Sequence, residues 1–578
     1  MIWIKVDHDH NAEYHFTGSI RCGRGALQPE QNTAQQAANL AAGDRLHCYT
    51  RRLGCWLVVS LLLPLAACEV GPDFARPTAP LAGNWLEAAD ASVHTDHQDD
   101  ERWWTVFHDP TLDRLIDIAY HQNLTLMEAG TRVLEARAEL GVAIGEFYPQ
   151  TQQIDASVGY NQASAVDPTS NPQHQLGNYW RASLGTRIAW ELDLWGKFRR
   201  GVESADASYL ASIASYDDVL VTLLSDVATN YIGIRTLQQQ LAIARENVIK
   251  QTKALQIARD RFHGGTATEL DVYQAENVLA QTESAIPQLT AQLQQGEDAL
   301  RVLLGMTPAS LAALLVGPDT IPVPPRDIAV GIPADLLRRR PDIRSAELKA
   351  AAQSAQIGLA KADLFPAFSL TGAFGTVAGT SGSNRLNDVF TAPGIQFAFG
   401  PSFSWPILNY GQITNNVRVQ DARLQTLLID YQNTVLKAQQ EVENSLAAFL
   451  QGRQQVDLLR RSVVAANHAL GIALDQYLLG TRDFTTVLTA EQNLYQAQSS
   501  LASAEGSLAN SLASLYRALG GGWQIREGND IVNDATRNEM RNRTDWGNVL
   551  PPSGQPQPST PGLPGPGDTG PNVRAPQW

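Results

Sequence analysis

Cysteine is missing from most of this sequence, and a long apolar run is missing from all of it. The four cysteines, Cys22, Cys48, Cys55 and Cys68, are confined to the beginning of the chain. The remainder therefore cannot form a disulfide or a thiolate metal site. No stretch reaches the roughly 18 consecutive apolar residues of a membrane-spanning helix, although membrane-spanning strands would escape this test.

Basic charge and catalytic motifs are also scarce. The formal net charge of −15 argues against nucleic acid or an anionic lipid surface as a partner. No G-x-S-x-G, Walker A or H-E-x-x-H pattern occurs. His94 and His97 lie near several acids but lack the ligand spacing that zinc needs, so a solvated loop is favoured there. We therefore expect no enzymatic activity, no cofactor and no bound metal.

The segment before Cys68 has the pattern of a bacterial export signal. Arg51 and Arg52 precede a short apolar run at 55–65, and two alanines then lead to Cys68. The pattern resembles a lipobox and predicts a signal peptide over 51–67 with lipidation of Cys68, several acyl chains making a stable anchor. An ordinary signal peptide with an incidental cysteine is the alternative. Glu69, directly after the cysteine, fits sorting to the outer membrane.

The polar residues 1–50 lie upstream of this complete signal. We interpret them as an extension that results from a start codon assigned too early. Residues 68–102 are expected to form a lipidated N-terminal linker.

An internal repeat is the strongest feature of the sequence. A shift of 215 positions brings Trp190 onto Trp405 and Gly196 onto Gly411. The same shift places a run of residues on identical ones: Ile257, Ala258, Asp260, Gly265, Thr266, Val272, Ala275, Glu276 and Leu279. One register kept over this distance indicates a tandem duplication. We expect repeats at 103–305 and 335–523, joined by a connector at 306–334.

Both repeats contain apolar residues at a sustained period of about 3.5, which is typical of helices wound as a left-handed coiled coil. No proline interrupts 197–263 or 410–480. Each of these segments is predicted to be one helix of roughly 100 Å, at about 1.5 Å per residue. Shorter helices are expected at about 111–147, 268–304, 335–363 and 484–519.

Between the helices the period drops to two. Ile395, Phe397 and Phe399 share one face, opposed by Gln396 and Ala398. Strands of about ten residues with one apolar face and one small or polar face suit a barrel wall between lipid and water. Four strands cannot close a barrel, so several chains must each contribute theirs. The strands are predicted at about 150–162, 182–195, 367–378 and 394–407.

The predicted fold class is a mixed α+β membrane protein. It combines a long α-helical coiled-coil barrel with four transmembrane β-strands per chain, in an internal tandem duplication. Without reference to any known protein, these patterns predict an oligomeric duct that lies partly in the membrane and partly in the periplasm.

Several motifs then follow one another in a familiar order. They are Cys68-Glu-Val-Gly-Pro-Asp-Phe-Ala-Arg-Pro77, Trp103-Trp104, Arg339-Arg340-Pro341-Asp342-Ile343-Arg344, Leu364-Phe365-Pro366, Tyr477-x-x-Gly480 and Leu515-Tyr516-x-Ala518-Leu519-Gly520-Gly521-Gly522-Trp523. Together they resemble the lipoprotein branch of the TolC-like outer-membrane efflux proteins, the OprM/NodT-like outer-membrane factors of RND tripartite pumps. The resemblance covers roughly 66–523.

This resemblance implies a homotrimer in the bacterial outer membrane, lipid-anchored, with a 12-stranded barrel and a helical barrel in the periplasm. An equatorial belt would be built from the connector and from residues after 520. The implied partners are outer-membrane lipid, a periplasmic adaptor (a membrane fusion protein) and an inner-membrane, proton-driven RND pump. The implied function is a passive gated duct that exports drugs and other toxic small molecules.

The resemblance also implies a gate at the periplasmic tip. The turns that would face the adaptor contain Gly264, Gly265, Thr266, Gly480, Thr481 and Arg482. The carried-over gate positions are Tyr477, Thr485, Thr489 and Gln492. Only Tyr477 keeps the residue type of its relatives, in which leucine, aspartate and arginine tend to occupy the other three positions. Asp271, Asp483 or Glu491 would then supply the negative charge, unless they are simply solvated helix faces. We expect a gate weaker than in relatives.

Two other functions remain open at this stage. A duct of a type I protein-secretion system shares the fold, although the Cys68 lipobox favours efflux. A periplasmic helical scaffold without a pore is the second, and the apolar-faced strands argue against it. Residues 524–578 form a polar tail, rich in proline and glycine at its end, that we expect to be disordered.

Overall fold

The computed structural model describes residues 69–94, 101–162, 178–317, 320–380 and 385–550. The extension 1–50, the signal peptide at 51–67, Cys68, His97 and the end of the tail (551–578) lie outside these ranges, so the predictions made for them stay predictions. The chain divides into two units after Ala67, and the fold described below belongs to the second unit.

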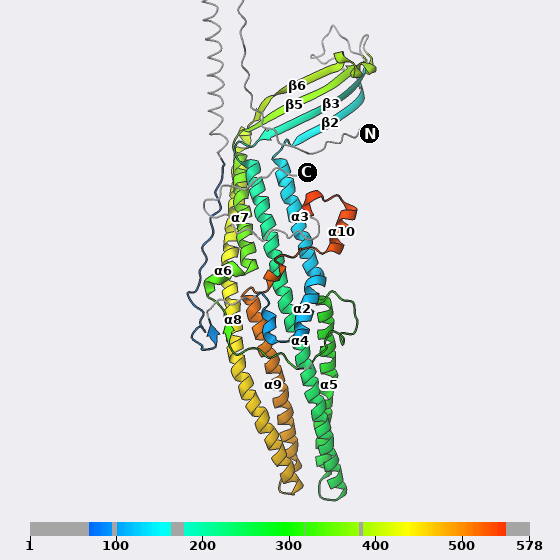
Figure 1. The fold of residues 1–578 in the computed structure, drawn as a ribbon, viewed down its shortest axis with the longest axis vertical. Helices are drawn as coiled ribbons and strands as arrows, with labels where there is room; N and C mark the ends of the chain where they lie inside the picture. Colours follow the sequence, from blue (N-terminus) through cyan, green and yellow to red (C-terminus); the bar gives the residue numbers. More distant parts are fainter. Residues whose placement is uncertain (1–68, 95–100, 163–177, 318–319, 381–384, 551–578) are drawn as a thin grey trace, which may run out of the picture. The chain divides into compact units, whose positions relative to one another are not determined.

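Each repeat contains one long helix with shorter helices beside it (Figure 1). The long helices are α4 (Lys197–His263, 67 residues) and α8 (Tyr410–Leu478, 69 residues). In the first repeat α3 (Leu124–Glu146) and α5 (Glu269–Leu303) pack along α4, and in the second α7 (Pro341–Ala362) and α9 (Phe484–Ala518) pack along α8. The predicted helices are thereby confirmed to within a few residues at most ends. Among the described residues, no helix has the length and apolar character needed to cross a bilayer.

Two of the predicted helices are interrupted. The segment expected at 111–147 divides at Asn123 into α2 (Pro110–Gln122) and α3, because the Asn123 side chain accepts a hydrogen bond from the Leu126 amide and so begins a new helix. The same side chain donates to the carbonyl oxygen of Leu303 at 2.9 Å. The segment expected at 335–363 begins with the short α6 (Leu336–Arg339) and restarts as α7, because Pro341 keeps the preceding residue extended.

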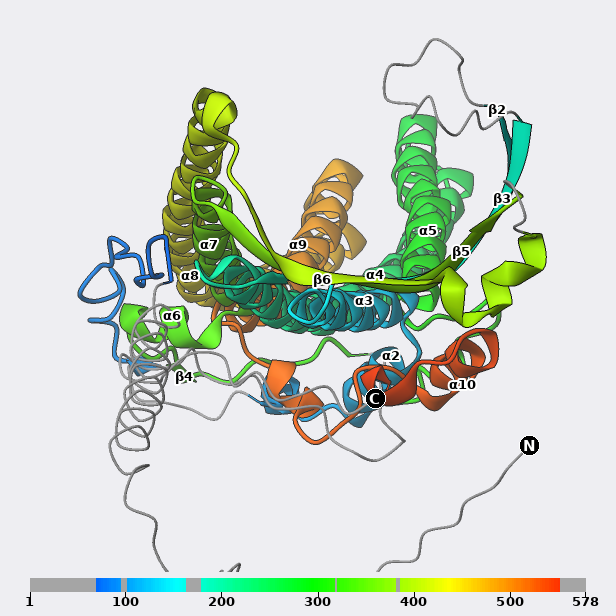
Figure 2. The same ribbon diagram turned by 90° about the horizontal axis from the view of Figure 1, so that it is seen from above.

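Four antiparallel strands form one sheet in the order β2-β3-β5-β6. They are β2 (Thr151–Gln162), β3 (Asn178–Leu192), β5 (Ala367–Gly379) and β6 (Ile395–Ser404). Within this unit the sheet lies at one end of the helices, and it curves from β6 to β2 (Figures 1 and 2).

The sheet corrects the predicted bounds of two strands, β3 and β6. β3 begins four residues earlier than expected and ends at Leu192 because Asp193 turns back to accept from the amides of Phe198 and Arg199 at the start of α4. β6 ends at Ser404 rather than at 407, because Pro406 has no amide hydrogen with which to extend the ladder.

The register gives the sheet two chemically different faces. Directly paired residues share a face, so that Phe374 lies beside Phe397 and Phe368 beside Phe403. One face carries large apolar side chains that are exposed in the single chain: Ile154, Val158, Leu184, Ile188, Phe374, Phe397, Phe399 and Phe403. The opposite face carries small, polar or charged ones: Asp155, Ser157, Arg181, Ser183, Arg187, Ser369, Gln396 and Ser402. This division matches a wall between lipid and water.

Tryptophan joins helix to strand in the same way in both repeats. The Trp190 indole Nε1 donates to the carbonyl oxygen of Phe147 at 3.2 Å, and that of Trp405 donates to the carbonyl oxygen of Leu364 at 3.1 Å. Trp190 and Trp405 are equivalent at the shift of 215, and Phe147 and Leu364 are equivalent at a shift of 217, which also brings Pro149 onto Pro366. The duplication therefore preserved a hydrogen bond as well as a pattern.

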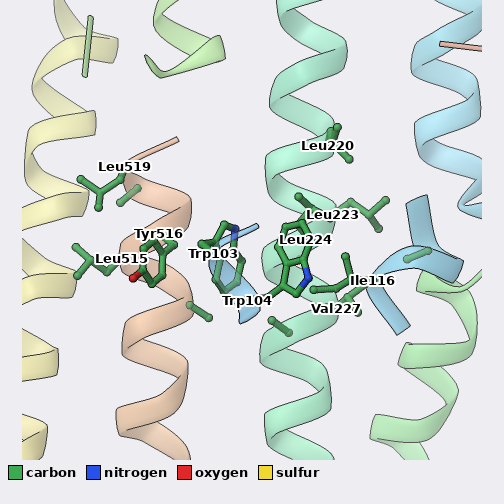
Figure 3. Packing of buried hydrophobic residues seen from close by; sticks show 14 of the residues in the cluster. Trp103, Trp104, Ile116, Leu220, Leu223, Leu224, Val227, Leu515, Tyr516 and Leu519 are labelled. Carbon is green, nitrogen blue, oxygen red and sulfur yellow. The ribbon is translucent and has the colours of Figure 1, made fainter. Parts of the chain in front are cut away.

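The main core lies where α2, α4 and the last turns of α9 meet (Figure 3). Trp103 and Trp104 come from a short 3-10 helix, η2 (Trp103–Phe107), and each is 2% exposed. The Trp103 ring stacks on Tyr516 of α9 with centroids 5.3 Å apart, while Trp104 meets it edge to face. The tryptophan pair is thus packed among the helices rather than presented to a ligand.

The connector between the repeats (306–334) pairs with the N-terminal linker (68–102). β1 (Val93–His94) pairs in parallel with β4 (Ile328–Ala329), and Leu311, Leu315 and Ile321 are buried. A short η3 helix (Pro333–Asp335) then leads into α6. Short 3-10 helices also border β6, namely η4 (Leu386–Phe390), η5 (Ala392–Gly394) and η6 (Ile407–Asn409).

The expectation of disorder after residue 523 is wrong for 524–550. This segment forms η7 (Trp523–Arg526), α10 (Asp534–Arg543) and η8 (Gly547–Val549). It buries a few apolar side chains against the helices: Ile531, Val532, Met540 and Leu550. The polar composition of 524–578 gave no indication that 524–550 is ordered, because a segment that packs on an existing core needs only a few apolar residues of its own.

Candidate functional site: the tips of the helical hairpins

Each repeat ends, away from the sheet, in a hairpin between its long helix and the following short one (Figure 1). Gly265 and Gly480 hold the equivalent left-handed position in the two turns, with φ of 73° and 72°. The amides of Thr266 and Thr481 close the turns by donating to the carbonyl oxygens of Arg261 and Gln476, each at 2.9 Å. This is the helix ending that glycine permits. The predicted tip residues Gly264 to Thr266 and Gly480 to Arg482 are all exposed there.

Two of the predicted acidic residues lie at helix starts beside these turns. The Asp271 carboxylate accepts from the Thr268 amide at 3.0 Å, and the two residues form the capping box of α5. Asp483 is the N-cap residue of α9, exposed and without a side-chain capping bond. Capping accounts for Asp271, which leaves Asp483 as the freer charge of the two.

Tyr477 is buried against the other wall of its own hairpin. It is 5% exposed, and its ring lies 4.9 Å from that of Phe484 at the start of α9. Its hydroxyl has no hydrogen-bond partner within the described residues. Burial raises the pKa of the Tyr477 hydroxyl.

Arg261 joins the two hairpins, and sequence reasoning missed it. From the last turn of α4 its guanidinium donates to the carbonyl oxygens of Tyr477 at 2.8 Å and Leu478 at 2.6 Å, at the end of α8. It also lies over the Tyr477 ring, 4.5 Å from the centroid. The positive charge thus meets the negative end of the α8 dipole. We call these contacts the Arg261 latch. An arginine in a last helical turn ordinarily serves its own helix, so the sequence carried no signal of this role.

Three predicted gate positions, Thr485, Thr489 and Gln492, are exposed along α9. The Thr489 hydroxyl donates to the carbonyl oxygen of Thr485 at 2.8 Å. Thr485 and Thr489 line an open groove of about 930 Å³ between α8 and α9, whose other wall is made largely of alanines. The structure therefore brings these two threonines together on a groove, while Gln492 is not among its lining residues.

Glu491 is buried among the helices rather than exposed at the surface of the tip. It is 3% exposed, and its Oε2 has no hydrogen-bond partner in the described part of the chain. Burial raises the pKa of Glu491 to about 7. Its repeat equivalent, Glu276, instead pairs with Arg259 at 2.5 Å. Leu474 stands in the position equivalent to Arg259, so the second repeat has lost that counter-charge.

The linker after Cys68 is held firmly near the sheet. The Val70 amide donates to the carbonyl oxygen of Trp195 at 3.1 Å, and the Glu69 carboxylate lies 3.3 Å from the buried guanidinium of Arg200. Gly71 passes so close to Gly358 of α7 that a side chain at either position would collide with backbone or with Arg200. The residue next to Cys68 is thus fixed at the sheet-proximal end of α4.

No group of three or more potential ligands gathers anywhere in the described ranges. His94 lies in β1, paired beside Ala329, and His97 is outside those ranges.

A sheet with one apolar and one polar face, continued by helices of roughly 100 Å, is the construction of an outer-membrane channel. Comparison with known proteins agrees. The family described as "Outer membrane efflux protein" matches residues 115–306 and 332–521, one range in each repeat. Nodulation protein T of Rhizobium leguminosarum bv. viciae is 31% identical over 440 residues, covering 76% of this chain and 88% of that protein.

Further relatives extend the match. Outer membrane protein OprJ of Pseudomonas aeruginosa is 29% identical over 472 residues, covering 82% of this chain and 96% of that protein. The solved structure of the outer-membrane channel OprN has a TM-score of 0.73 at 32% identity, covering 79% of this chain and 100% of that one. The chain belongs to the outer membrane efflux protein family. It is the outer-membrane channel of a tripartite efflux pump, in a family of ducts rather than enzymes.

Proposed function

We propose that three copies of this chain form a gated duct, anchored by lipid on Cys68, which receives small molecules from a periplasmic adaptor and an inner-membrane RND pump. The observation that carries the proposal is an asymmetry between the two long helices. α4 is packed by α3, α5, α7 and α9, whereas the main helical neighbours of α8 are α7 and α9 alone. Because the repeats are equivalent, the neighbours that α8 lacks correspond to α3 and α5 of a second copy.

The exposed face of α8 supports this reading. Val419, Ile429 and Leu436 are 46%, 56% and 51% exposed. Their equivalents on α4, Ser204, Ala214 and Val221, are 5%, 1% and 4% exposed. Ser204 accepts a hydrogen bond from Gln356 of α7, which shows what covers this face in the first repeat. In the assembled duct, α3 of the next copy takes the place of α7.

The groove between α8 and α9, nearer the tips of the hairpins, also supports assembly from several copies. Its lining residues Ala466, Ala473 and Ala490 are equivalent to Gln251, Ala258 and Ala275. Those three are nearly inaccessible in the single chain, because α9 packs onto α4 and α5. The occupant of the α8–α9 groove is therefore α5 of a neighbouring copy, the equivalent of α9. Seen from above, the helices of the two tip hairpins follow one another in the order α8, α9, α4, α5 (Figure 2). This order allows the wall of helices to continue from one copy of the chain to the next.

The sheet imposes the same requirement. β2 and β6 are edge strands within the chain. An unpaired edge is not tolerated in lipid, so β2 of one copy pairs with β6 of the next. Three copies supply twelve strands, above the minimum of about eight for a closed membrane barrel. The apolar face then meets lipid and the polar face lines the duct.

A cross-linking experiment tests the assembly. Within one chain the side-chain amide of Asn247 on α4 donates to the side-chain oxygen of Gln498 on α9 at 2.8 Å. The equivalent pair across copies is Ser462 with Glu283. Cysteines at 462 and 283 should oxidise into covalent dimers and trimers in the outer membrane. The control pair, cysteines at 247 and 498, should close within one chain and leave the apparent mass of a monomer. Failure of the first pair, while the control closes, would refute the proposed contact.

A further inference from the structure

The helices of the two tip hairpins, α4 with α5 and α8 with α9, meet in layers that repeat every seven residues. Asn247 of α4 is hydrogen-bonded to Gln498 of α9, and the two helices run in opposite directions. One heptad closer to the tip, Ala254 therefore lies level with Glu491. One heptad further, Arg261 lies level with Phe484, which contacts Tyr477. Glu491 thus lies one layer above the Arg261 latch.

The surroundings of Glu491 are apolar. The cluster that spans these layers contains Ala254, Leu255, Ala258, Ala275, Val278, Leu470, Ala473, Phe484, Val487, Leu488 and Leu494, together with Tyr477, whose buried hydroxyl has a raised pKa and so stays neutral over this range. Glu491 belongs to the same α9 face, and its carboxylate has an unpartnered oxygen among the described residues. An ionised carboxylate in such a place lacks the hydrogen bonds or counter-ion that would offset its lost hydration.

The charged side chains at this level do not compensate. They are Lys253, Arg259, Asp260 and Arg261 on α4, Asp271 and Glu276 on α5, and His468 and Asp475 on α8. Arg259 is paired with Glu276, Arg261 is engaged in the latch and Asp271 in the α5 cap. Lys253, His468 and Asp475 are exposed, and Asp260 accepts from Gln256. Burial is the sole cause of the raised pKa of Glu491, with no contribution from these groups.

We propose that Glu491 makes the gate proton-sensitive: in its neutral form it lets α9 pack on α4 above the Arg261 latch, and its ionisation loosens that packing and favours the open state. The inference rests on the proposed function as a gated duct and adds a regulation to it. Because the neutral form belongs to the closed packing, acid favours closure. The ratio of open to closed channels rises by at most about tenfold per protomer for each pH unit through neutrality.

Glu276 provides a matched control within the same chain. It occupies the equivalent position in the first repeat but is partly exposed and ion-paired. The conductance of the purified full-length protein in planar bilayers should be measured from about pH 5.5 to about pH 8.5, a range that brackets the titration of a buried carboxyl. The proteins compared are the wild type, Glu491→Gln, Glu276→Gln and Arg261→Ala.

We expect the open probability of the wild type and of Glu276→Gln to rise with pH, and that of Glu491→Gln to stay low and flat. Spin labels on cysteines at Thr266 and Thr481 should separate at high pH in the wild type but not in Glu491→Gln. The inference is overturned if Glu491→Gln follows the wild-type pH profile, or if the wild type is flat while Arg261→Ala conducts. Absence of current in every variant, Arg261→Ala included, would overturn the duct itself and the inference with it.

Discussion

Arg526 and Asp217, separated by 309 positions in the sequence, form a buried bidentate ion pair. The guanidinium donates to the two carboxylate oxygens at 2.5 and 3.1 Å, and the two side chains are 3% and 5% exposed. The pair attaches the segment after α9 to the first third of α4. It explains how a polar segment such as 524–550 becomes part of the helical core.

Removing one partner of this pair should be costly. Arg526→Ala leaves the Asp217 carboxylate buried without its counter-ion, which typically destabilises a protein by about 3–5 kcal/mol. Urea unfolding should show that loss, and limited proteolysis should cut within 524–550 first. Arg460→Ala is the control, because its pair with Glu505 is far more exposed, with side chains 54% and 22% accessible, and a pair of this kind is typically worth about 1 kcal/mol or less. Equal stability of the two variants would contradict the role assigned to the Arg526 pair.

Breaking the Arg261 latch should open the channel. Arg261→Ala removes two charge-assisted hydrogen bonds to the end of α8, each worth about 1.5–3 kcal/mol in a favourable setting. We expect the open-state population in planar bilayers to rise by about tenfold or more, at any pH. Arg259→Ala removes a charge from the same helix without touching α8, so its conductance should remain near that of the wild type. An unchanged conductance in Arg261→Ala would show that the latch does not hold the gate.

The tryptophan hydrogen bonds should contribute independently in the two repeats. Trp190→Phe and Trp405→Phe keep an aromatic side chain but remove the indole donor, and the lost hydrogen bond should cost about 1 kcal/mol in each case. Their effects on the free energy of unfolding should add in the double variant, because the two bonds share no partner. Melting followed by circular dichroism of the solubilised protein measures this. A double variant no less stable than either single one would argue against two separate junctions.

Lipidation should depend on Cys68 alone. Cys68→Ala should abolish incorporation of labelled palmitate, whereas Cys55→Ala, within the apolar run, should leave it intact. Mass spectrometry of the mature wild-type protein should give the mass of a chain that begins at residue 68 and carries its acyl chains. Label in the Cys68→Ala protein, or a mature chain that begins elsewhere, would refute the lipobox interpretation.

Much of the fold was predictable because it is periodic. The duplication follows from identical residues that recur at a shift of 215. The long helices at 197–263 and 410–478 and all four strands follow from spacings of about 3.5 and 2 in the apolar pattern. The tip turns were predictable because glycine marks the left-handed position, as at Gly265 and Gly480. The break at Asn123 was missed because the apolar pattern continues across it, although an asparagine cap leaves a signal that could have been weighed.

By itself, the sequence determined which residues form helix and strand and which face of each is apolar, since these properties depend on residues close together in the chain. Only the tertiary structure decided that Arg261 reaches α8, that Glu491 is enclosed, and that Arg526 joins the final segment to α4. Each of these outcomes depends on which distant side chains meet. A local period specifies that a face will be covered, but the identity of what covers it emerges only when the helices pack.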